Sequence, residues 1–100
     1  MFSSVDLLNL TIDKFCLSSD YALSKLLGVT PGLISKHRKK SFGMSDELAL
    51  NVADKLGYDP AFVIACVNYE RAKCAAQKAV YFRLAALANL NPERPARLHK

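Results

Sequence analysis

The chain lacks tryptophan and has only four glycines, four prolines and three cysteines in 100 residues. Cys16, Cys66 and Cys74 form no CxxC pair, so we expect reduced thiols in a cytosolic protein rather than a disulfide framework. Two histidines (His37 and His99) and these cysteines have no metal-ligand spacing, and we expect neither a metal nor a cofactor.

A secretory signal and a membrane span are also missing. No basic region precedes an apolar run at the N-terminus, and the run 61–67 is far too short to cross a bilayer. We therefore expect no membrane partner.

Patterns that carry catalysis are absent as well. No Cys/His or Ser/His/Asp set has supporting context, and no glycine-rich loop could hold a phosphate. Asp46 and Glu47 are interpreted as charges at a helix start rather than as a catalytic pair. We expect a protein that is not an enzyme and has no small-molecule substrate.

What the chain does contain is apolar residues (51%) and a net charge of +5 with an uneven distribution. Residues 31–43 hold four basic residues and no acidic one, whereas an acidic segment follows at 44–60. Such a patch fits phosphate, although a solvated charged face has the same composition.

The order of start and stop signals predicts an all-α fold of five to six helices, because no segment alternates as a strand does. Each of the five start signals is a capping side chain, and two of them precede a proline. The predicted starts are Ser4, Ser19, Thr30-Pro31, Ser45 and Asp59-Pro60, and the predicted stops are Gly28 and Gly57. Residues 61–89 are compatible with helix throughout, with a break expected near 74–75. We divide the chain into a core at 1–60, a helical packing or dimerisation region at 61–90 and a flexible basic tail at 91–100.

The segment 20–39 has the pattern of a helix-turn-helix, a unit whose second helix fits the DNA major groove. Its inward positions are apolar, its crossing position is small and its corner is a glycine. These positions are Leu23, Ser24, Leu27, Gly28, Val29 and Ile34. His37 stands where an apolar residue is usual. It can pack as a neutral core histidine, reach a phosphate or titrate as a switch.

Three sequence stretches, LSKLLGVT at 23–30, LISK at 33–36 and LALNVADKLGYDP at 48–60, resemble the XRE/Cro (lambda-repressor-like) family. YERAK at 69–73 and YFRLAA at 81–86 are similar to small regulators of filamentous phages and prophages. The resemblance implies a five-helix DNA-binding core, frequent dimerisation and transcriptional control.

Helical spacing places four residues on the face expected to enter the groove and contact bases: Gly32, Ser35, Lys36 and Lys39. Lys36 can donate to guanine O6 or N7. The residues expected to contact DNA phosphates are Lys25, Thr30, Arg38 and Lys40. Thr30 matches a family position that binds phosphate. Pro31-Gly32 departs from the polar readers of many relatives, so part of the recognition is expected to depend on DNA shape.

The region 61–90 has more apolar surface than an isolated helix should expose. We expect a homodimer, with half-sites about one DNA turn apart. Its expected interface is Tyr69, Val80, Tyr81, Leu84 and Leu87. Intramolecular packing of this helix is the alternative.

These observations together predict a sequence-specific transcriptional regulator on double-stranded DNA, of the phage or prophage Cro repressor type. Its expected location is the cytoplasm of a bacterial host, at the nucleoid. The alternatives are a protein-interaction module (antitoxin, antirepressor or adaptor) and an excisionase or activator with the same fold.

Overall fold

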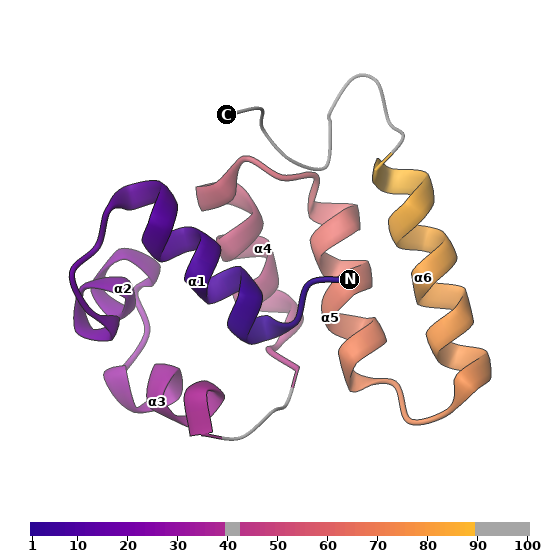
Figure 1. Cartoon of the computed structure of the whole chain (residues 1–100), viewed down its shortest axis with the longest axis horizontal. Helices are drawn as coiled ribbons and strands as arrows, with labels where there is room; N and C mark the ends of the chain where they lie inside the picture. Colours follow the sequence, from indigo (N-terminus) through magenta and orange to yellow (C-terminus); the bar gives the residue numbers. More distant parts are fainter. Residues whose placement is uncertain (40–42, 90–100) are drawn as a thin grey trace.

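The computed structural model describes residues 1–39 and 43–89, which form six α-helices and no strand (Figure 1). The helices are α1 (Ser4–Phe15), α2 (Asp20–Leu27), α3 (Pro31–Lys39), α4 (Asp46–Leu56), α5 (Pro60–Arg71) and α6 (Ala75–Asn89). The all-α prediction is confirmed for these residues. Lys40 and the predicted tail at 91–100 lie outside them.

Local capping explains most helix starts. The side chains of Ser19, Ser45 and Asp59 each accept a hydrogen bond from a backbone amide in the first turn of the following helix. These bonds satisfy amides that have no partner inside the helix. Gly28 ends α2 with a φ of 68°, in the left-handed region that glycine adopts without strain.

The first helix begins one residue earlier than predicted. Ser3, not Ser4, is its N-cap, and Ser3 and Asp6 form a reciprocal capping box. Ser4 is instead buried, because its hydroxyl donates to Glu70 Oε1 at 2.7 Å and accepts from the Met44 amide at 2.9 Å. The local capping box favours Ser3 as the N-cap, and the long-range bonds to Glu70 and Met44 explain why Ser4 is buried.

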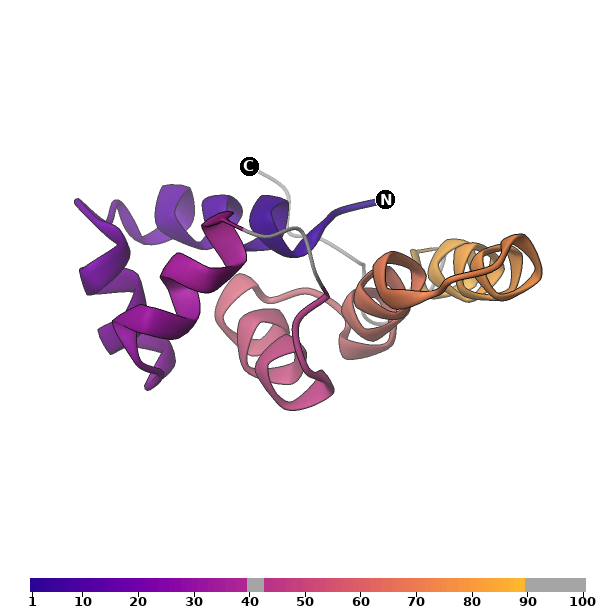
Figure 2. The same cartoon turned by 90° about the horizontal axis from the view of Figure 1, so that it is seen from below.

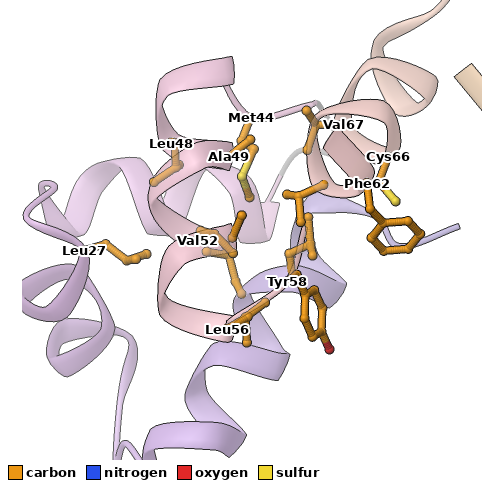
Figure 3. Close-up of a cluster of buried hydrophobic side chains, with 14 of the residues drawn as sticks. Leu27, Met44, Leu48, Ala49, Val52, Leu56, Tyr58, Phe62, Cys66 and Val67 are labelled. Carbon is orange, nitrogen blue, oxygen red and sulfur yellow. The ribbon is translucent and has the colours of Figure 1, made fainter. Parts of the chain in front are cut away.

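One hydrophobic core joins α1, α2, α4 and α5 (Figure 3). Leu56 and Val52 of α4 lie between Leu27 of α2 and the aromatic side chains of Tyr58 and Phe62. Phe62, which follows the boundary predicted at 60/61, is buried in this same core. Removing α5 would therefore expose the α4 side chains that pack against it.

The sixth helix lies on the outside of the fold. It runs beside α5, to which a short turn connects it, and its main contacts are with α5 (Figure 1). The predicted break occurs at residues 72–74, slightly before the expected position. Only Ala85 of α6 is buried.

Candidate nucleic-acid interface

The helix pair α2–α3 is joined by a tight corner. The Val29 amide donates to the Ser24 carbonyl at 3.0 Å, closing the chain around Gly28. Ser24 is buried, as its predicted place at the helix crossing requires. Figure 2 shows that α2 and α3 run in different directions, with α3 on the side that faces the viewer.

Thr30 and Pro31 start α3. Thr30 Oγ1 accepts a hydrogen bond from the Leu33 amide at 3.2 Å, and Pro31 takes the first helical position, where it loses no hydrogen bond. Because the hydroxyl uses its oxygen as the acceptor here, its hydrogen remains able to donate. Thr30 is exposed, so this donor can reach a phosphate oxygen.

One side of α3 is buried against the rest of the protein. Ile34 is fully buried and His37 is only 2% exposed. His37 therefore occupies the packing position that the sequence pattern gave it, and its ring lies too deep to contact a phosphate. A titrating role for His37 stays a prediction.

The other side of α3 faces solvent. Gly32, Lys36 and Lys39 are exposed and Ser35 is half-buried at the edge of the same face. A Cβ built on Gly32 would meet nothing closer than Thr30 Oγ1 at 3.9 Å, so the start of this face is open. The four side-chain positions expected to contact bases thus share one accessible surface.

Arg38 was expected to contact a DNA phosphate, but its guanidinium is already bonded to side chains of the protein. Its Nη2 is 2.9 Å from Asp20 Oδ1 and its Nε donates to Asp20 Oδ2 at 3.2 Å, while Nη1 donates to Asn9 Oδ1. The Arg38 side chain is 25% exposed. This arginine links α3 to the start of α2 and to α1, and its charge is already balanced by Asp20.

Tyr21 is a surface residue that the sequence patterns did not single out. Its side chain is 59% exposed, and Lys25 Nζ lies 5.3 Å from the centre of its ring. The spacing of four residues between this aromatic ring and the lysine was the available signal. Tyr21 limits where Lys25, an expected phosphate contact, can reach.

The residues expected to form a dimer interface divide between two surfaces. Val80, Leu84 and Leu87 are 56%, 47% and 60% exposed, and their spacing places them on one face of α6. Tyr81 is half-buried, and together with Leu84 and Leu87 it lines a groove of about 630 Å³ between α5 and α6. Tyr69 instead packs against Phe82, with 6.4 Å between the ring centres. Because Phe82 is two residues after Val80, it projects from roughly the opposite side of α6.

Among the described residues, no three histidine, cysteine or acidic side chains cluster to hold a metal, and no helix is long and apolar enough to cross a membrane. Comparisons of the chain with protein-family models, with curated proteins and with solved structures find no match.

Proposed function

We propose that this protein is a DNA-binding transcriptional regulator in which α2 and α3 form a helix-turn-helix and α3 enters the major groove. The observation that carries the proposal is the division of α3 into a buried face, with Ile34 and His37, and an exposed face, with Lys36 and Lys39. A helix that is anchored on one side and basic on the other suits a groove lined by phosphates.

Lys36 is the proposed reader of a base. It is exposed at the middle of the open face, and a lysine there can donate to guanine O6 and N7. Ser35 is the second base contact, and Gly32 allows close approach of the backbone. Lys39 is a further base contact on the same face, and Thr30 binds a phosphate beside it. Pro31 offers no donor at the start of the helix, so DNA shape supplies part of the specificity.

The finer proposal is a phage or prophage repressor of the Cro type, which acts at the nucleoid in the cytoplasm of a bacterial host. Its support is the sequence resemblance to that family, together with an all-helical fold that has the expected turn between α2 and α3. An excisionase or activator would use the same surface, and its target DNA would separate these roles.

In vitro selection of bound duplexes from a random pool tests the proposal. Replacing Lys36 with alanine should weaken binding to the selected site by about 1–3 kcal/mol and relax one base position. Lys55→Ala is the matched control, because Lys55 lies in the last turn of α4 and its removal deletes the same charge. A Lys36→Ala protein that selects the same sequence with the same affinity would refute the role given to Lys36.

We further propose that α6 forms a homodimer. Four of the eight large hydrophobic side chains that are exposed among the described residues belong to α6. A stable interface buries about 800 Å² on each partner, more than Val80, Leu84 and Leu87 supply alone. Leu84 and Leu87 also line the groove between α5 and α6, and its other lining residues, including Ile64, Tyr81 and alanines of both helices, provide the additional surface. The same patch of the two copies would then pack against itself, as an isologous interface requires.

Light scattering or sedimentation at tens of micromolar protein measures this association. Leu84→Glu should give a monomer, since it places a charge at the centre of the apolar face. Leu50→Glu changes a leucine that is about as exposed, on α4, and should leave the dimer intact. An unaltered chain that is monomeric under these conditions contradicts the dimer.

The same α6 surface favours the second candidate function, a protein-interaction module such as an antitoxin, antirepressor or adaptor. In that case another protein, not a second copy, covers Val80, Leu84 and Leu87. A monomeric chain that fails to retard DNA at low salt, together with a partner whose binding is lost in Leu84→Glu, would favour this function over DNA binding.

A further inference from the structure

The turn between α5 and α6 is the centre of a second basic region. Residues 71–89 include Arg71, Lys73, Lys78 and Arg83 and no acidic residue. This region is far in sequence from the basic helix α3. Its position in the fold decides whether the two regions can contact the same ligand.

Contacts of Arg71 bring the end of α5 close to Gly43 and to the start of α4, the helix that follows α3 in the chain. A Cβ on Gly43, four residues after the end of α3, would collide with the side chain of Arg71 at Cγ. Arg71 Nη1 also pairs with Asp46 Oδ1 at 3.1 Å, at the start of α4. The end of α5 is therefore packed against Gly43 and the first residue of α4. Figure 1 shows α3 and the α5–α6 turn along the same lower edge, and Figure 2 shows this edge from below.

Some charged side chains on this edge are already bonded within the protein, and others remain able to bind a ligand. Arg71 is paired with Asp46, and Glu70 accepts two hydrogen bonds from Ser4. Lys78 Nζ donates to the Tyr69 carbonyl at 2.9 Å. Lys73 is exposed, and no hydrogen bond or ion pair to another described residue holds its side chain.

Glu47 is the opposing charge on this edge. It is exposed in the first turn of α4, where Asp46 is already paired with Arg71. A carboxylate at that point repels phosphate and cancels the attraction of the helix N-terminus. Lys73 in the turn is therefore better suited than the start of α4 to contact a DNA phosphate.

We infer that the α5–α6 turn is a second contact with the DNA backbone, in which Lys73 binds a phosphate beside the groove that α3 occupies. The inference rests on the proposed function. The major groove is about 12 Å wide, so a protein surface on the same edge as the inserted helix (Figure 1) faces the strands that border the groove. Lys73 would add affinity and fix the register of α3 without reading sequence.

Salt dependence of DNA affinity tests the inference directly. Fluorescence anisotropy with a labelled duplex of mixed sequence, about 20 base pairs long, measures binding by the unaltered chain and by Lys73→Ala. A plot of log affinity against log salt concentration has a negative slope. Loss of one phosphate contact should make this slope less steep by about 0.9 for each protein copy bound. The affinity should fall roughly eightfold at about 0.1 M salt, and the difference should vanish toward about 1 M.

Two further variants separate this inference from the proposed function. Lys55→Ala removes the same charge at the last turn of α4 and should keep the slope of the unaltered chain. Lys36→Ala should change the sequence selected from a random pool, whereas Lys73→Ala should select the same sequence.

A Lys73→Ala slope equal to that of Lys55→Ala would overturn the inference and leave the proposed function standing. A less steep slope in Lys73→Ala would support the contact with the DNA backbone. If Lys36→Ala also selected the same sequence as the unaltered chain, base reading by Lys36 of α3 would be contradicted. An unaltered chain that binds no duplex at low salt would overturn both.

Discussion

The pair of Arg38 and Asp20 offers a direct test of how α3 is held. We expect the guanidinium to stabilise the fold and to orient α3, not to bind DNA. The perturbation is a double-mutant cycle of Arg38→Met and Asp20→Asn. Methionine keeps much of the aliphatic packing of the arginine stem, and asparagine keeps the shape of the aspartate.

The structure sets the expected magnitude. The pair is bidentate, with contacts of 2.9 and 3.2 Å, which favours a strong interaction. Its side chains are 25% and 45% exposed, so water screens part of the attraction. We expect a coupling of about 0.5–1 kcal/mol and a total cost of about 1–2 kcal/mol for Arg38→Met, which also loses the bond to Asn9. For a chain of this size, 1 kcal/mol lowers Tm by about 4–8 °C.

Urea denaturation of the four proteins in the cycle measures the coupling, and DNA binding across a range of salt concentrations supplies the second readout. The double variant has the net charge of the unaltered chain and should keep its log–log slope. A coupling within about 0.3 kcal/mol of zero, together with a salt slope that is less steep by about 0.9 in Arg38→Met, would refute this reasoning. Arg38 would then be the phosphate contact expected from the sequence.

Three further predictions concern Gly28, Glu70 and the thiol of Cys66. Gly28→Ala should lower the free energy of unfolding by about 1 kcal/mol in urea, because alanine is strained at a φ of 68°. Gly28→Asn should cost less, and equal stability of all three proteins would contradict the strain. Glu70→Ala should destabilise the fold by about 1–3 kcal/mol in thermal unfolding, since it leaves the buried hydroxyl of Ser4 without this acceptor. Burial raises the pKa of the Cys66 thiol, so less thiolate exists at a given pH. Iodoacetamide labelling followed by mass spectrometry should therefore modify the exposed Cys16 and Cys74 before Cys66 at pH 8, and faster labelling of Cys66 would contradict this order.

Helix boundaries were predictable where their cause is local. Ser19, Ser45 and Asp59 cap the helices that follow them, and Gly28 ends α2, because these effects act within a few residues. Ser4 shows the limit of this reasoning. Its neighbour Ser3 has a local partner in Asp6, which completes the capping box, whereas the partner of the Ser4 hydroxyl is Glu70, which is distant in sequence.

The candidate site was predictable in its pattern but not in its charges. Spacing along one helix identified the exposed side of α3, including Lys36 and Lys39, because helical geometry fixes which residues share a face. Spacing says nothing about which charges are already paired. The ion pair of Arg38 with Asp20, and the approach of Arg71 to Gly43, arise from the crossing of different helices.

The bonds between Ser4 and Glu70 also affect how the protein forms during synthesis. They join residues 66 positions apart, and the same serine hydroxyl holds the Met44 amide just after the α3–α4 connection. The ribosome must release most of the chain before this junction can close. A nascent or prematurely terminated product without α5 would carry every residue of α3 yet lack the Glu70 side chain that holds Ser4, so partial translation products should compete poorly for the proposed DNA target.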